Sequence, residues 1–140
     1  MDHQSVVILG VRVCAIDQRG LIEQVITWVK QGEQHSLTYA NAHSLNLAME
    51  DASFRELLDK TDLVYVDGIG VVWAGRLFGR ESLHKVTGRK WIDALCRRGE
   101  EEALRLYLLG GKPGIAEQAS KMLKQRYPRM ILCGSADGFF

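Results

Sequence analysis

Short apolar runs alternate along the chain with longer segments in which apolar residues recur every three or four positions. The short runs are rich in β-branched residues, which is typical of strands, and they lie at residues 6–9, 36–40, 63–66, 104–109 and 130–133. The longer segments, around residues 21–29, 91–96 and 115–123, predict helices with one buried face. Strand and helix therefore alternate throughout the predicted structure.

Local signals predict where two of the helices begin. Residues 53–56 read Ser-Phe-Arg-Glu, a capping-box pattern that predicts a helix capped by Ser53. Pro113 follows Gly110 and Gly111 and suits the first turn of the next helix. The whole pattern predicts an α/β fold, a Rossmann-like and largely parallel sheet flanked by helices, with ligands at the carboxyl ends of its strands.

Composition narrows the class of protein. The 140 residues are 46% hydrophobic and 25% charged, which predicts a single globular domain over residues 1–140 and argues against disorder. The longest stretch without Asp, Glu, Lys or Arg, residues 34–49, is too short and too polar for a transmembrane helix. The N-terminus lacks the basic start of a signal peptide, and three unpatterned cysteines suit a reducing compartment, so a cytoplasmic location is expected.

The net charge of +1 conceals an asymmetry between the two halves of the chain. Residues 1–70 carry 5 basic and 10 acidic side chains, whereas residues 71–140 carry 13 basic and 7 acidic ones. Much of the local excess comes from Arg76, Arg80, Lys85, Arg89 and Lys90, which only Glu81 opposes. This segment could attract phosphate or an anionic membrane, or it could simply be a solvated basic face. Nucleic acid is not an expected partner.

Polar residues follow two of the predicted strands. Asp67 ends the third apolar run and precedes Gly68, so its carboxylate could face a substrate as a general base or cap the following helix. Asn41 follows the second run and could contact a ligand or cap a helix. Nearby His43 is more typical of a surface residue than of a catalyst.

A glycine-rich turn follows the fourth run. Gly110, Gly111 and Gly114 could let phosphate approach backbone N–H groups at a helix N-terminus, with Lys112 as a nearby charge. The alternative is a tight turn that needs glycine for geometry alone, and the pattern is neither a Walker loop nor a dinucleotide fingerprint. The four histidines and three cysteines lack metal-site spacing, so no metal is expected.

Five motifs taken in order resemble the WecG/TagA/CpsF glycosyltransferase family. They are YANAH (39–43), DLVYVDGIGVV (62–72), VTG (86–88), LLGGKPG (108–114) and YP (127–128). The resemblance implies an inverting, metal-independent bacterial enzyme without a cofactor. Such an enzyme moves a sugar such as N-acetylmannosamine from a UDP-sugar to an undecaprenyl-diphosphate-linked acceptor. Its products are teichoic acid linkage units, enterobacterial common antigen and exopolysaccharides.

The resemblance also implies roles for individual residues. Asp67 matches the proposed general base, Asn41 matches an active-site asparagine, and the glycine-rich turn lies near the donor nucleotide. The enzyme would work at the inner face of the plasma membrane, with peripheral membrane contact in its full-length form, and self-association into a homo-oligomer is left open. The expected substrate-binding residues are Thr38, Tyr39, Asn41, Gly68, Arg76, Lys85, Gly88, Gly110, Gly111, Lys112 and Gly114.

The chain departs from the family pattern at three places. Tyr39 stands where the family often has Thr, and Lys90 stands where it usually has Asp. The sequence stops at Phe140, before the family's Gly-x-Pro-x-Gln-Glu motif and arginine-rich tail, so we expect a C-terminally truncated form.

Two other functions stay open at this point. One is a different nucleotide-binding enzyme such as an oxidoreductase, although the dinucleotide fingerprint is missing. The other is a noncatalytic module. Binding of UDP, of NAD or of no nucleotide would separate the three.

Overall fold

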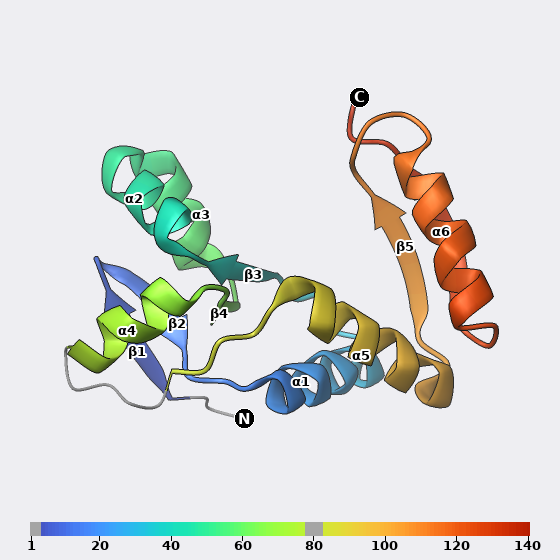
Figure 1. The fold of residues 1–140 in the computed structure, drawn as a ribbon, viewed down its shortest axis with the longest axis horizontal. Coiled ribbons are helices and arrows are strands. Elements are labelled where there is room, and N and C mark those ends of the chain that lie inside the picture. Colours follow the sequence, from blue (N-terminus) through green and yellow to red (C-terminus); the bar gives the residue numbers. More distant parts are fainter. Residues whose placement is uncertain (1–3, 78–82) are drawn as a thin grey trace. The chain divides into compact units, whose positions relative to one another are not determined.

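The structure is a computed structural model that describes residues 4–77 and 83–140. Its fold is mixed α/β, as predicted (Figure 1). The chain forms two compact units, Met1–Trp91 (unit 1) and Ile92–Phe140 (unit 2), which are described separately. In chain order the elements are β1 (Ser5–Ile8), β2 (Val11–Cys14), α1 (Gln18–Gln31), β3 (Leu37–Ala40), α2 (Ala42–Glu50), α3 (Ala52–Lys60), β4 (Leu63–Val66), α4 (Ile69–Leu77), α5 (Gly88–Glu102), β5 (Arg105–Leu109), α6 (Ile115–Arg126) and β6 (Ile131–Ala136).

The strands of unit 1 form two pairs. β1 and β2 form an antiparallel hairpin around Leu9 and Gly10, which both have positive φ angles, of 48° and 79°. Such angles suit a two-residue hairpin turn. β3 and β4 run parallel, with Leu37 opposite Leu63 and Ala40 opposite Val66.

The order of elements differs from the predicted alternation of strand and helix. β2 was not predicted, and among the described residues α3 follows α2, and α5 follows α4, without a strand between them. The strands of the described residues form three two-stranded sheets, of which β3–β4 and β5–β6 are parallel. The tight turn at Leu9–Gly10 explains the first difference, because it folds the chain straight back into an antiparallel partner.

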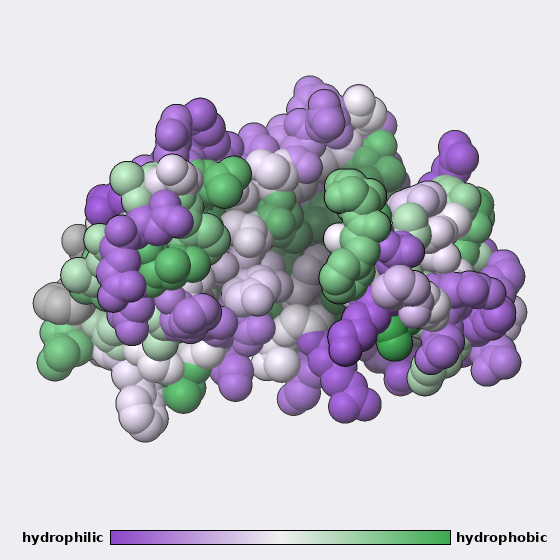
Figure 2. All heavy atoms as spheres, turned by 90° about the horizontal axis from the view of Figure 1, so that it is seen from above, coloured by the Kyte–Doolittle hydropathy of each residue, from purple (hydrophilic) through white to green (hydrophobic). Residues whose placement is uncertain are grey.

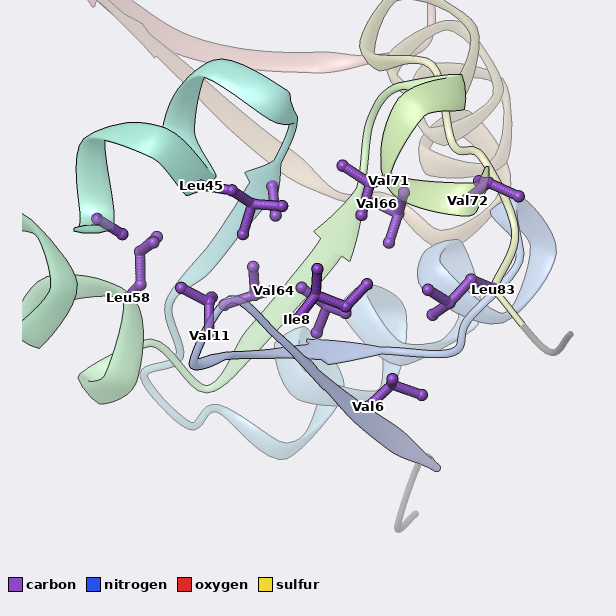
Figure 3. Close-up of a cluster of buried hydrophobic side chains, with 13 residues drawn as sticks. Val6, Ile8, Val11, Leu45, Leu58, Val64, Val66, Val71, Val72 and Leu83 are labelled. Atoms are coloured by element: carbon purple, nitrogen blue, oxygen red, sulfur yellow. The ribbon is translucent and has the colours of Figure 1, made fainter. Parts of the chain in front are cut away.

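The core of unit 1 lies between the strands and the helices α2, α3 and α4 (Figure 3). All four residues of β4 are buried, as expected of a strand that is covered on both faces. The hairpin contributes alternate residues, so that Val6 and Ile8 are buried whereas Val7 is exposed. The cluster comprises Val6, Ile8, Val11, Val13, Ala40, Leu45, Ala48, Leu58, Val64, Val66, Val71, Val72 and Leu83.

Side-chain caps fix the starts of α2 and α3. Asn41 Oδ1 accepts a hydrogen bond of 2.9 Å from the Ser44 N–H, and Ser44 Oγ accepts one of 2.8 Å from the Asn41 N–H. For α3 the prediction of Ser53 as the cap is wrong. Asp51 is the cap, because its carboxylate accepts hydrogen bonds from the N–H groups of Ser53 and Phe54.

Unit 2 is built from the parallel pair β5–β6 with α6 packed against it. α6 begins at Ile115, so the prediction that Pro113 lies in its first turn is wrong. The reason is Gly114, which caps the helix with a left-handed φ of 85° and places Pro113 before the helix. Buried Tyr127 donates a hydrogen bond of 2.5 Å to Asp93 Oδ1 and so ties the end of α6 to α5.

Asp62 joins the starts of the two parallel strands of unit 1. Its Oδ2 accepts hydrogen bonds of 2.8 Å from both the N–H and the hydroxyl of Ser36. These bonds, with a further contribution from His35, lower the pKa of Asp62 from 3.8 to about 2. The ionised carboxylate therefore stabilises the folded state above pH 4, and this stabilisation is lost as the pH falls from about 4 to about 2.

We predict that Asp62→Asn lowers the melting temperature at pH 7 and flattens its decline between pH 4 and pH 2. The neutral amide cannot gain the stabilisation that ionisation gives the carboxylate. Thermal unfolding followed by circular dichroism across this pH range measures the effect. Asp59→Asn, at an exposed position of α3, is the control. An acid profile identical to that of the wild type would contradict the assigned role of Asp62.

We also predict that Asn41→Ala lowers the free energy of unfolding by about 1 kcal/mol, since it removes the cap of α2. Asn41→Asp keeps the accepting oxygen and should keep most of the stability. Urea unfolding measures both variants. Asn46→Ala, at an exposed position within α2, is the matched control and should not destabilise the protein. If Asn41→Ala were as stable as the wild type, the cap would contribute nothing.

Candidate functional site

The carboxyl ends of β3 and β4 bring Asn41 and Asp67 to one edge of the sheet. Ala40 and Val66 are paired, so the next residue of each strand lies at the same level. The Asp67 N–H donates a hydrogen bond of 2.9 Å to the Ala40 carbonyl, which extends the pairing past the strands. The sequence pattern predicted this common edge for both side chains.

Two glycines bring backbone close to these side chains. Gly68 has a φ of 143°, and a Cβ added there would lie 3.6 Å from the Asn41 Cβ. Gly88 is the first residue of α5, and a Cβ added there would lie 3.8 Å from Asp67 Oδ2. The N-terminus of α5 therefore lies close to the Asp67 carboxylate.

Asp67 is half-buried and retains access to solvent. α4 begins at Ile69, so Gly68 directly precedes the helix and Asp67 lies one position further back. The Val86 N–H donates a hydrogen bond of 2.8 Å to the Val66 carbonyl, which holds the start of α5 beside the end of β4. Asp67 is thus a carboxylate on a rigid strand end that can accept a proton from a bound molecule.

An aromatic row, Tyr39, Tyr65 and Trp91, borders the site. Tyr39 was expected to bind substrate, whereas Tyr65 and Trp91 were not predicted as site residues. The ring centroids of the tyrosines lie 6.1 Å apart, and those of Tyr65 and Trp91 lie 5.9 Å apart. Trp91 Nε1 donates a hydrogen bond of 3.0 Å to Tyr65 Oη. Burial, and to a lesser degree the charge of Asp67, raise the pKa of the Tyr65 hydroxyl, which keeps it neutral.

Strand alternation explains how the aromatic row relates to the polar pair. Tyr39 and Asn41 are two positions apart, as are Tyr65 and Asp67, so all four side chains share one face of the β3–β4 sheet. Tyr39 is 46% exposed and can offer its ring to the apolar face of a ligand. The same two-residue spacing in the sequence was the available signal for Tyr65.

The remaining candidate residues of unit 1 do not all lie beside Asn41 and Asp67. Thr38 is half-buried and, by strand alternation, lies on the opposite face from Tyr39. Arg76 is exposed in the last turn of α4, at the helix end remote from Gly68. Lys85 and His43 are exposed, and Arg80 lies outside the described residues.

In unit 2 the glycine-rich turn follows the carboxyl end of β5 and is hydrogen-bonded to the chain at the carboxyl end of β6. The Gly110 N–H donates to the Ala136 carbonyl and the Gly138 N–H donates to the Gly111 carbonyl, each at 3.0 Å. Exposed Lys112 lies in the same turn. A polar pocket of about 250 Å³ adjoins the start of α6 and is lined by Gly114, Ala116, Glu117, Ser135, Ala136 and Asp137.

The two carboxylates of this pocket already have partners. Glu117 forms an ion pair of 2.7 Å with Lys121, and Asp137 accepts a hydrogen bond of 2.9 Å from the Phe139 N–H. These contacts reduce the repulsion that an anion would meet at the start of α6.

Within residues 4–77 and 83–140, no three His, Cys, Asp or Glu side chains are grouped as metal ligands would be. The helices of the same residues include none with the length and apolar character needed to cross a bilayer.

Comparison with known protein families identifies the chain. Residues 6–140 match the family described as glycosyl transferase WecG/TagA/CpsF. The matched region includes both polar strand ends, the aromatic row and the glycine-rich turn. Since the match covers nearly every residue, the protein belongs to the WecG/TagA/CpsF family and is a glycosyltransferase of cell-surface polysaccharide synthesis.

Proposed function

We propose that the protein transfers a sugar of the N-acetylmannosamine type from UDP to an undecaprenyl-diphosphate-linked acceptor, with inversion and without a metal ion. The observation that carries this proposal is the placement of Asp67 beside Asn41 at one strand edge, in a chain that belongs to a glycosyltransferase family. Because the acceptor is lipid-linked, the reaction belongs at the cytoplasmic face of the plasma membrane.

In the proposed reaction Asp67 is the general base. The acceptor hydroxyl oxygen attacks the anomeric carbon of the donor sugar while the bond from that carbon to the UDP oxygen breaks. The hydroxyl proton passes to the Asp67 carboxylate, and UDP leaves with the bonding electron pair. Attack from the side opposite the leaving group inverts the anomeric centre.

The neighbours of Asp67 support this role. The N-terminus of α5 at Gly88 lies close to Asp67 Oδ2, where its backbone N–H groups can help to hold oxygen atoms of a bound substrate. We propose that the Asn41 amide binds a sugar or phosphate oxygen and that the exposed Tyr39 ring packs against the sugar.

The leaving UDP carries negative charge that must be stabilised without a metal. We propose that backbone N–H groups of the turn at Gly110, Gly111 and Gly114, together with Lys112, bind the donor nucleotide. Arg76 and Lys85 are proposed to add positive charge on the acceptor side.

That residues 1–140 form a single domain stays a prediction.

We predict that Asp67→Asn reduces turnover by about 10²–10⁴, since it removes a positioned general base. UDP affinity and melting temperature should change little, because Asn is close to Asp in size and polarity. Transfer of radiolabelled sugar to a lipid-linked acceptor analogue measures turnover, with Asp59→Asn as the control. Turnover near the wild-type rate would remove Asp67 as the base.

We further predict that UDP binds with unchanged affinity in the presence of EDTA, since the proposed donor site uses backbone N–H groups and Lys112. Isothermal titration calorimetry with and without EDTA tests this. Binding that occurs only with Mg²⁺ or Mn²⁺ would contradict the metal-independent mechanism.

A further inference from the structure

The outer face of α4 carries large apolar side chains that the described residues of unit 1 leave exposed. Ile69, Trp73 and Leu77 recur every four residues and are 49%, 64% and 83% exposed. Residues at this spacing lie on one face of a helix. Val71 and Val72 on the inner face are buried in the core, so α4 is apolar on both sides.

The apolar surface continues past α4 towards the β1–β2 turn. An apolar pocket of about 160 Å³ is lined by Ile8, Leu9, Ala42, Leu45, Asn46, Gly70, Val71 and Ala74. Leu9 at its rim is 49% exposed. We call Leu9, Ile69, Trp73 and Leu77 the α4 surface. Figure 2 shows exposed apolar groups of this kind among hydrophilic ones on the face that it views.

Positive charge accompanies the α4 surface. Arg76 is exposed three residues after Trp73, so it lies on the same helix face as the tryptophan. From Ile69 to Trp91 the described residues include no Asp or Glu, whereas Arg76, Lys85, Arg89 and Lys90 are all exposed. A partner that complements this surface is therefore both apolar and anionic.

We propose that the α4 surface docks on an anionic lipid bilayer, with Trp73 and Leu77 inserted at the interface and Arg76 among the headgroups. Tryptophan, aliphatic residues and arginine on one exposed helix face are the combination that interfacial helices use. A second copy of the chain fits less well. A two-fold contact between the outer faces of α4 would place the two Arg76 guanidinium groups near each other, and α4 itself carries no acidic residue to pair with them.

This docking would bring the proposed active site to the membrane. Its biological role rests on the proposed function. α4 begins two residues after Asp67, at the same strand edge. A bilayer in contact with the α4 surface would bring the headgroup of a lipid-linked acceptor to the part of unit 1 that holds the proposed base.

The test is co-sedimentation with vesicles of phosphatidylcholine, with and without phosphatidylglycerol. We expect binding to phosphatidylglycerol vesicles, weakened roughly tenfold by each of Trp73→Gln and Leu77→Gln. Arg76→Gln should weaken it about fivefold at low salt and less at high salt. Leu57→Gln is the matched control, because Leu57 on α3 is 64% exposed, as Trp73 is, and lies outside the α4 surface.

Wild-type vesicle binding by the Trp73→Gln and Leu77→Gln variants would overturn the proposal. The proposal would also be overturned if sedimentation equilibrium showed a dimer that both substitutions dissociate while vesicle binding stays unchanged. Transfer to a water-soluble acceptor analogue keeps the test separate from the proposed function. The double variant should retain that transfer, whereas failure of the wild type to transfer would count against the function and not against the docking.

Discussion

The parallel pairing of β3 with β4 is the constraint on which the architecture of unit 1 depends. It is held at the start by Asp62, which binds Ser36, and at the end by the hydrogen bond from Asp67 to Ala40. β4 is buried along its whole length, so its register cannot slip without moving polar groups into the core. The positions of Asn41 and Asp67 follow directly from that register.

The packing around β4 also sets the distance between the catalytic candidates and their neighbours. α2 starts at the end of β3, and α5 starts beside the end of β4 through the hydrogen bond from Val86 to Val66. The N-termini of α2, α4 and α5 thereby gather at one sheet edge. The positive ends of these helix dipoles make this edge the natural place for oxygen-rich ligands.

Much of this edge could be predicted from sequence because it depends on local patterns. The apolar runs that end before Asn41 and Asp67 are strands in the structure, and both polar residues follow them. The Tyr65–Trp91 contact could not be predicted, because it joins residues that only the tertiary fold brings together. Asp51 and Ser53 both fit a cap, and only the backbone geometry selects Asp51.

The cap on α2 restricts what Asn41 can offer to a substrate. A backbone N–H can only donate, so the bond from Ser44 fixes the amide oxygen towards the helix and leaves the NH₂ group as the part that can face outward. The side chain is thereby pre-oriented as a donor. It would select acceptor atoms such as a sugar carbonyl or a phosphate oxygen, and reorienting it to receive a hydroxyl proton would uncap the helix.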